Sequence, residues 1–451
     1  MSGIPSNILW FIVAISVLVA VHEYGHYIVG RLCGMKVLRF SIGFGKPIWT
    51  WVGKKPDQTE YCISAIPLGG YVKFLDEREQ PVSAEDQGRA FTHRPIPSRI
   101  AVLLAGPFFN FLFAVFAYWV LFVNGVPALK PAVGEVTADS YADAAGLQYG
   151  DRILAVGDHD ATDWESTLIA MLGEMVDNGK IPLRVQREGR SPKLAVIDVG
   201  NDSARLTEPG LLFDGIGFAP WQPPAVVAEV TEGGAAEAAG IQEGDRITRI
   251  DGETIYNFGD LSRVVSERPD QQVTIDYVRN EREQSTQATI ESIDVDGEQK
   301  GRLNVTIMSD FGDLRYDRQY GLFAALGESV SQTWTTTAFT AGMLFRMATG
   351  DVSFKNISGP ISIAQYVGES AAAGFDRFLR ILAVISISLG VLNLLPVPIL
   401  DGGQIVYQLI EALKGSPLSD RSQIFGQQVG ILALLILMSF AFYNDFARIF
   451  A

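Results

Sequence analysis

An apolar run from Ile8 to Val29 contains the pentapeptide His22-Glu23-Tyr24-Gly25-His26. The run is long enough for a helix that crosses a bilayer, which takes roughly 20 residues. Residues four positions apart lie on one face of a helix, so His22 and His26 can bind one Zn²⁺ while Glu23 stands beside it as a general base. Chargeable side chains inside a membrane segment are costly unless something compensates them, and a metal ion would do so. The alternative is a chance match at the end of an amphipathic helix.

The composition is typical of membrane spans combined with a large polar region. The chain has 451 residues, of which 48% are hydrophobic and 19% charged, and its mean hydropathy is +0.18. Its net charge of −15 argues against nucleic acid as a partner. Cys33 and Cys62 have neither the spacing of a redox motif nor histidine neighbours, so we expect ordinary buried thiols.

Four apolar stretches are long enough to cross a bilayer, so the sequence predicts four transmembrane helices. They run at about Ile8 to Val29, Arg99 to Val123, Phe378 to Leu395 and Val429 to Phe446. Nothing basic precedes the first stretch and no Ala-x-Ala site ends it, so we expect a retained anchor and not a cleaved signal peptide.

Basic residues near the spans predict the orientation in the membrane. No Lys or Arg precedes the first span, whereas many crowd the loop from Arg31 to Arg99, so that loop should be cytoplasmic. The amino terminus and the long segment from Asn124 to about Asp376 should then lie on the opposite side. His22 and His26 come late in the first span and should lie in the cytoplasmic half of the membrane.

The long segment contains an internal repeat. The run Ala144-Ala145-Gly146-Leu147-Gln148-Tyr149-Gly150-Asp151-Arg152-Ile153 recurs as Ala238-Ala239-Gly240-Ile241-Gln242-Glu243-Gly244-Asp245-Arg246-Ile247. Two copies of one module are indicated. The pattern resembles PDZ domains, which often bind carboxyl-terminal peptides by adding a strand to a sheet edge. No convincing carboxylate-binding loop precedes either opening strand, at Gly134 and at Val227, so peptide capture and simple size filtering both remain open.

For three further features the sequence predicts a structural role. The segment from Tyr320 to Met347 has apolar side chains at helical intervals, which predicts an amphipathic helix on the membrane surface or the core. The run Asn356-Ile357-Ser358-Gly359-Pro360 predicts a turn. His93 and His159 are not spaced to join a metal site, so we expect them at the surface.

Asp401 is the candidate for a third metal ligand, because a catalytic zinc site takes three protein ligands and leaves one position for water. It follows Asn393-Leu394-Leu395-Pro396-Val397-Pro398-Ile399-Leu400 at the predicted cytoplasmic end of the third span. The prolines before it and the glycines after it could unwind a helix and aim the carboxylate inward. The alternative is an N-cap of a helix that begins near Gln404. The histidine pair on the same side favours ligation.

Taken together, the motifs resemble the site-2 protease family. They are HExxH in the first span, Asn-x-x-Pro-x-Pro-x-Leu-Asp-Gly in the third, and tandem PDZ-like modules between the second and third. Nearly the whole chain agrees with the family pattern, including Gly43-Phe44-Gly45, Gly69-Gly70-Tyr71-Val72-Lys73 and Ala105-Gly106-Pro107-Phe108-Phe109-Asn110. The resemblance implies a multi-pass α-helical membrane protein of the bacterial inner membrane, with a zinc metalloprotease core and two inserted PDZ-like α+β domains on the periplasmic side.

The resemblance also implies an activity, intramembrane proteolysis. Its expected substrates are transmembrane segments of single-span proteins, such as anti-sigma factors in envelope stress signalling and remnant signal peptides, and its surroundings are membrane lipid. Zinc held by His22, His26 and Asp401 would activate water, with Glu23 moving the proton. A substrate helix must unwind before its backbone can be cut.

Substrate contacts are expected at four residues. Asn393 could hydrogen-bond the exposed substrate backbone, although an interhelical hydrogen bond is an equal alternative. The loop with Gly43 and Gly45, together with the hairpin at Tyr71, could offer a strand edge to the substrate.

Five segments are predicted along the chain. Residues 1–123 carry the first two spans, 124–222 and 223–310 the two PDZ-like domains, 311–375 the amphipathic connection, and 376–451 the last two spans. A transporter would show repeated intramembrane charges or inverted repeats, and neither is seen in the sequence. A noncatalytic PDZ scaffold would have no need of His22, Glu23, His26 and Asp401, yet all four are present.

Overall fold

The computed structural model describes residues 4–54, 57–295 and 297–450. The chain divides into two compact units, which we describe separately. The first unit holds the two ends of the chain, up to Val126 and from Asp317 onward, and the second unit is Pro127–Tyr316. Residues 1–3 and 451 of the predicted end segments lie outside the described residues.

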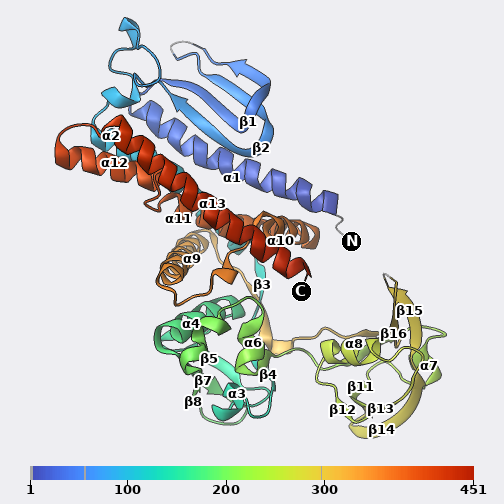
Figure 1. The fold of residues 1–451 in the computed structure, drawn as a ribbon. Helices are drawn as coiled ribbons and strands as arrows, with labels where there is room; N and C mark the ends of the chain where they lie inside the picture. Colours follow the sequence, from blue (N-terminus) through green and yellow to red (C-terminus); the bar gives the residue numbers. More distant parts are fainter. Residues whose placement is uncertain (1–3, 55–56, 296, 451) are drawn as a thin grey trace. The chain divides into compact units, whose positions relative to one another are not determined.

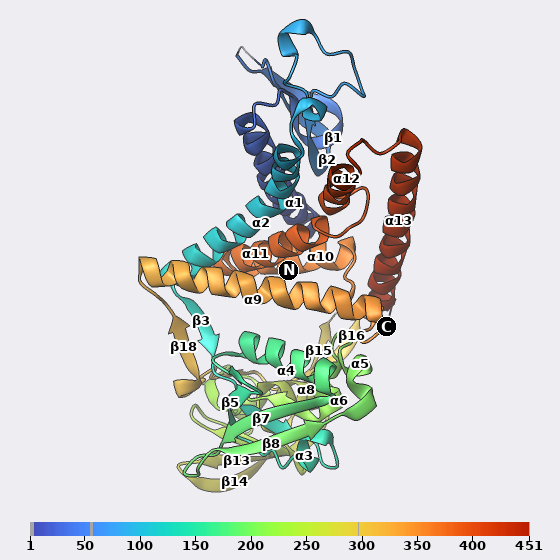
Figure 2. The same cartoon turned by 90° about the vertical axis from the view of Figure 1, so that its left-hand side faces the viewer.

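Helices dominate the first unit (Figures 1 and 2). They are α1 (Ile4–Leu32), α2 (Ile96–Asn124), α9 (Leu322–Thr349), α10 (Pro360–Ala373), α11 (Phe375–Asn393), α12 (Asp401–Lys414) and α13 (Asp420–Phe450). In the described part of the chain, three helices are long and apolar enough to cross a membrane: Ile4–Leu32, Ile96–Asn124 and Arg421–Phe450. The predicted third span falls on α11, whose first turns carry Asp376, Arg377 and Arg380. These charges keep α11 out of that group, so a fourth span stays a prediction.

Helices α1 and α2 approach each other closely where the pentapeptide lies. A Cβ atom on Gly25 would overlap the carbonyl of Ala105, so this contact requires glycine. Small residues at such crossings let helices approach inside a membrane. On its other side α2 packs against α11, where the Ser386 hydroxyl donates to the carbonyl oxygen of Asn110 at 2.9 Å. Helix α2 therefore lies between the pentapeptide helix and the helix that leads to Asp401.

A curved antiparallel hairpin follows α1. Its strands are β1 (Val37–Val52) and β2 (Glu60–Phe74). The pairing is irregular, because residues 37–42 pair with both residues 60–63 and residues 70–74. The segment 70–74 is consequently an outer row of this small sheet. It also lies against α1, since a Cβ on Gly70 would touch the side chains of Val19 and Glu23.

The second unit contains two modules with the same strand order, β6-β5-β7-β8 and β12-β11-β13-β14. Each module adds a two-stranded pair, β4-β9 or β10-β17, and has its own buried apolar cluster. The first module comprises β4 (Val133–Val136), α3 (Tyr141–Ala144), β5 (Arg152–Val156), β6 (His159–Asp160), α4 (Trp164–Asn178), β7 (Lys180–Gln186), β8 (Lys193–Asp198), α5 (Ser203–Leu206), α6 (Leu211–Ile216) and β9 (Phe218–Pro220). The shared strand order agrees with the repeat in the sequence, and assignment of both modules to the PDZ fold stays a prediction.

The second module repeats this plan. It comprises β10 (Val227–Val230), α7 (Ala235–Ala238), β11 (Arg246–Ile250), β12 (Glu253–Thr254), α8 (Phe258–Ser266), β13 (Gln272–Arg279), β14 (Arg282–Thr289), β15 (Glu291–Val295), β16 (Glu298–Arg302) and β17 (Val305–Ile307). Strands β3 (Val126–Leu129) and β18 (Arg315–Arg318) pair with each other.

The repeated Gly-Asp turn has a physical explanation that is the same in both modules. Asp245 is fully buried, accepts the backbone N–H of Gln242 at 2.7 Å, and binds Arg279 through both carboxylate oxygens at 2.7 and 2.6 Å. Asp151 is also fully buried and binds Gln148 and Arg187 in the same way. The aspartate thus ties the turn to a distant strand of its module.

We expect Asp245→Ala to lower the free energy of unfolding of the second module by about 3 kcal/mol, because it leaves the Gln242 backbone amide without its acceptor and removes the carboxylate from Arg279. Proteolysis of the full-length protein across a urea series measures this change. The matched control is Glu243→Ala, which alters an exposed carboxylate on the same turn. Equal urea midpoints for the two variants would show that the buried carboxylate does not stabilise the turn.

Candidate metal centre

Three potential ligand atoms converge in the first unit. His22 and His26 lie on α1, and Asp401 is the first residue of α12. The Nε2 atoms of the two histidines are 3.2 Å apart, and the Asp401 Oδ2 atom lies 3.2 Å from the first and 3.4 Å from the second. Side chains far apart in the sequence thus form a cluster of the kind that could hold a metal ion.

The spacing of these atoms fits a tetrahedral zinc ion. Ligand atoms about 2.1 Å from a tetrahedral Zn²⁺ lie about 3.4 Å from one another, close to the separations in the cluster. Among the described residues, Asp401 Oδ2 is buried without a hydrogen bond of normal geometry. A buried carboxylate oxygen is costly to leave unpaired, so its position between two imidazole nitrogens favours a cation there. The two histidines and the aspartate therefore have the donor set and the geometry for zinc.

Helix α2 holds the histidine rings from the far side. His26 Nδ1 donates to the Val102 carbonyl oxygen at 2.7 Å, which leaves its Nε2 lone pair directed at the cluster. A Cβ on Gly106 would overlap the Nε2 atoms of both rings, so this glycine makes room for them. The His22 Nδ1 atom lies 3.1 Å from Asn110 Nδ2. These contacts fix how both rings face Asp401.

Glu23 lies beside the cluster and next to the hairpin. It is half-buried on α1, and its side chain lies against the outer row of the hairpin sheet, where a Cβ on Gly70 would come within 3.3 Å of its Cγ atom. The only general base that the sequence predicts is thus adjacent to a strand edge.

The turn before Asp401 is compact. Helix α12 begins at Asp401, and the residue in the N-cap position is Leu400, which makes no side-chain cap hydrogen bond. The structure thus differs from the alternative in which Asp401 caps a helix that starts near Gln404. Cβ atoms on Gly402 and Gly403 would overlap the backbone of residues 394–398, so the turn from α11 to α12 closes tightly only with glycine there. This turn points the aspartate toward α1.

The predicted substrate-binding residues lie on three elements, α11, β1 and β2. Asn393 is the last residue of α11 and is half-buried. Gly43 and Gly45 have φ values of 91° and 86°, a backbone region that favours glycine. Tyr71 lies on β2, where its ring stacks on Phe44 at 6.3 Å. The structure brings Phe44 and Tyr71 together, whereas no described contact joins Asn393 to them.

The role of α2 was not assigned from the sequence. The sequence indicates Asn110 and Gly106 only as part of the run that agrees with the family pattern. A polar asparagine in the middle of an apolar span, four residues after a glycine, was the available signal, because such a side chain needs a partner inside the membrane.

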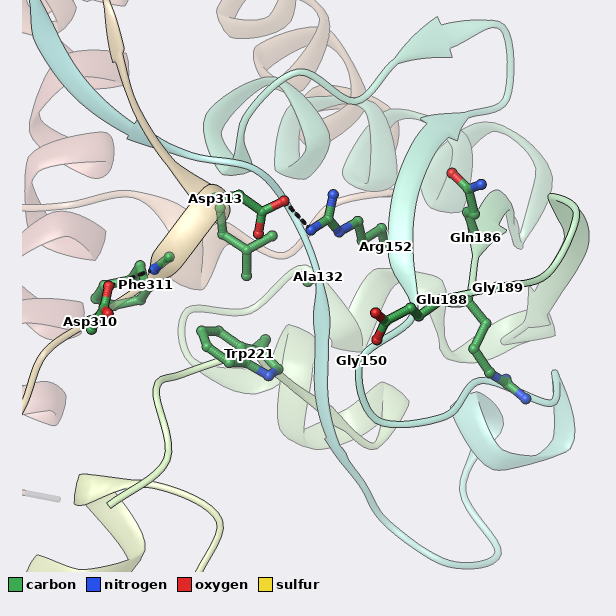
Figure 3. A pocket seen from close by; sticks show the side chains of 13 residues that line it. Ala132, Gly150, Arg152, Gln186, Glu188, Gly189, Trp221, Asp310, Phe311 and Asp313 are labelled. Carbon is green, nitrogen blue, oxygen red and sulfur yellow. Dashed lines mark hydrogen bonds and ion pairs between the residues drawn. The ribbon is translucent and has the colours of Figure 1, made fainter. Parts of the chain in front are cut away.

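The second unit has a cavity of about 690 Å³ that is lined by both charged and apolar side chains (Figure 3). It is lined by the start of β5, by the end of β7 and the turn after it, and by residues 310–314, which follow β17. Figure 3 shows Arg152 donating to Asp313 across it, with Trp221 and Phe311 near its wall. The cavity contains no such set of converging metal ligands among the described residues that line it. The metal centre in the first unit is therefore the better candidate for the active site.

Comparison with known proteins agrees with this site. A family model described as Peptidase family M50 matches residues 10–437. The chain belongs to this family. It is therefore a zinc metalloprotease, as the sequence predicts, and its apolar helices make it a membrane member of the M50 family.

Relatives match over the full chain. The "Regulator of sigma-E protease RseP" of Salmonella typhimurium is 38% identical over 464 residues, covering 98% of this chain and 100% of that protein. The Escherichia coli protein of the same name is 37% identical over 462 residues, with the same coverage. A Vibrio cholerae protein whose name describes a zinc metalloprotease is 39% identical over 466 residues, covering all of both chains. The resemblance to site-2 proteases is thus confirmed.

A solved structure also matches part of the chain. The crystal structure of a PDZ domain from an SdrC-like protein of Listeria monocytogenes has 18% identity and a TM-score of 0.18, and the match covers 23% of this chain and 98% of that one.

Proposed function

We propose that this M50 protease cuts transmembrane segments of single-span membrane proteins, in the manner of regulated intramembrane proteolysis. The observation that carries the proposal is the convergence of Asp401, from α12, on His22 and His26 of α1, a helix apolar enough to cross a membrane. Ligands that lie within a membrane helix place the chemistry within the bilayer. A water-soluble substrate would not enter the bilayer and so would not reach these ligands.

His22, His26 and Asp401 would hold the zinc ion. When bound, zinc lowers the pKa of a water molecule toward about 7 and polarises the scissile carbonyl. The Glu23 carboxylate would accept a proton from the attacking water and donate it to the leaving amine.

Substrate positioning falls to the hairpin and to Asn393. A transmembrane helix hides its amides in its own hydrogen bonds, so a substrate must first unwind. Residues 70–74 form an outer row of the hairpin sheet beside Glu23. An extended substrate segment that adds a strand there brings its backbone to the general base. The Asn393 amide would bind the exposed carbonyl. The loop with Gly43 and Gly45, together with the hairpin at Tyr71, would offer the strand edge.

Sidedness and partners belong to the same proposal. The basic loop from Arg31 to Arg99 favours the cytoplasm, which puts the metal centre toward that side of the bacterial inner membrane and the PDZ-like modules in the periplasm. The Salmonella typhimurium and Escherichia coli relatives both carry the name regulator of sigma-E protease. This supports an anti-sigma factor as one substrate, with remnant signal peptides as a second.

The proposal is tested by reconstituting the purified chain in proteoliposomes with a tagged single-span substrate. We expect zinc-dependent fragments whose new ends map by mass spectrometry to residues inside the apolar span. Cuts confined to the water-exposed part of the substrate would contradict the proposal.

The modules are proposed to act as a size filter. We expect deletion of residues 131–307 to leave an enzyme that binds zinc and also cuts untrimmed substrates, because the metal ligands all lie outside that segment. Cleavage of substrates with and without their external domain measures the effect, with the intact chain as control. A deletion variant that inserts, binds zinc and still cuts only trimmed substrates would assign filtering to another segment, such as α9.

A further inference from the structure

Asn110 contacts a predicted metal ligand as well as a neighbouring helix. It is fully buried in α2, and its side-chain Nδ2 atom lies 3.1 Å from His22 Nδ1. Its backbone carbonyl already accepts the Ser386 hydroxyl, so the contact with α11 does not use the side-chain amide. The amide therefore has His22 as its recorded partner.

The arrangement on α2 is regular. Val102, Gly106 and Asn110 follow one another at intervals of four residues, as His22 and His26 do on α1. Residues at this spacing form one stripe on a helix. Val102 meets His26, Asn110 meets His22, and Gly106 leaves space for both rings between them. Each imidazole thus has one α2 group at its Nδ1 atom.

Both imidazoles can bind a metal through Nε2 only if Val102 and Asn110 each accept a hydrogen bond from the Nδ1 atom of their histidine. The Val102 carbonyl can only accept, so it fixes the proton of His26 on Nδ1 and leaves Nε2 free. An amide N–H at His22 Nδ1 would instead force the proton onto Nε2, the atom that faces Asp401, and block ligation. The oxygen and nitrogen of an asparagine amide exchange places by a half-turn, and their assignment rests on the hydrogen-bond network. A metal site requires the oxygen at His22.

We propose that Asn110 is a positioning residue whose side-chain carbonyl accepts the Nδ1–H of His22 and so holds the Nε2 lone pair toward zinc. This inference rests on the zinc centre of the proposed function. Asparagine would then serve His22 as the Val102 backbone serves His26. Outer partners of this kind typically change metal affinity 10–100-fold when removed.

The test measures zinc affinity of the purified full-length chain by competition with a chelator. We expect Asn110→Leu, which keeps the shape and removes the acceptor, to raise the zinc Kd by about 10–100-fold. Asn110→Asp provides a carboxylate that can only accept, so its Kd should stay within about threefold of the parent value. The matched control is Asn124→Leu on the same helix, whose amide is exposed and bonds Val120; it should bind zinc like the parent.

A parent-like Kd in Asn110→Leu would overturn the inference, because the amide would then serve only helix packing. A loss in Asn110→Asp as large as that in Asn110→Leu would also overturn it, because the amide would then act as a donor. If Asn110→Leu fails to insert, Asn110→Ala, which also removes the acceptor, takes its place with the same expected loss of zinc affinity. Since the readout is metal binding, a parent chain that binds zinc but leaves transmembrane substrates intact would contradict the proposed function and not this role of Asn110.

Discussion

Replacing Glu23 with glutamine is expected to abolish cleavage and leave zinc bound. Glutamine has the size of glutamate but cannot take a proton from water, and general acid-base catalysis contributes about 10²–10⁴-fold to rates. We therefore expect kcat for a single-span substrate in proteoliposomes to fall by about 10³-fold, with the zinc content of the purified protein unchanged.

The control for this experiment is Glu369→Gln, the same change at an exposed position of α10. It should cleave like the parent. A Glu23→Gln variant with parent activity, or one that loses zinc as completely as His22→Ala, would show that Glu23 is not the general base.

Replacing Asp401 with alanine is expected to remove zinc and activity together. The carboxylate oxygen lies 3.2 and 3.4 Å from the two imidazole nitrogens, so its loss opens one corner of the ligand set. We expect a loss of zinc affinity greater than the roughly 10–100-fold typical of an outer partner, with the protein still inserted in the membrane. Metal analysis and a chelator titration of the purified variant measure it.

Asp351→Ala changes an exposed carboxylate of the same unit and serves as the control. Full zinc occupancy in Asp401→Ala would place the third ligand elsewhere. It would leave Asp401 with a structural role at the start of α12.

Short-range patterns made much of the fold predictable. The apolar run around the pentapeptide predicts a helix, and α1 spans Ile4–Leu32. The amphipathic segment from Tyr320 to Met347 corresponds closely to α9, Leu322–Thr349. The repeated Gly-Asp turns predict two related modules, and the structure gives them one strand order. Local periodicity and repeats are read directly from the sequence, so these features needed no knowledge of packing.

Features that depend on packing between distant segments were harder to predict. Sequence reasoning proposed Asp401 as a ligand from its side of the membrane, but the tight turn that aims it depends on Gly402 and Gly403 lying against residues 394–398. Asn110 received no role because its partner, His22, becomes visible only when α1 and α2 are placed together. In the hairpin, residues 37–42 pair with two different segments, and the alternation of polar and apolar residues along the strands does not predict this.

X-ray absorption at the zinc edge of the purified full-length protein tests the central claim most directly. The claim is that one zinc ion is held by His22, His26 and Asp401, whose ligand atoms the structure brings together. We predict a four-coordinate site with two imidazole nitrogens and oxygen ligands at about 2.0–2.1 Å, and loss of the zinc spectrum in His26→Ala. A spectrum with sulfur ligands at about 2.3 Å, or one unchanged by His26→Ala, would contradict the account.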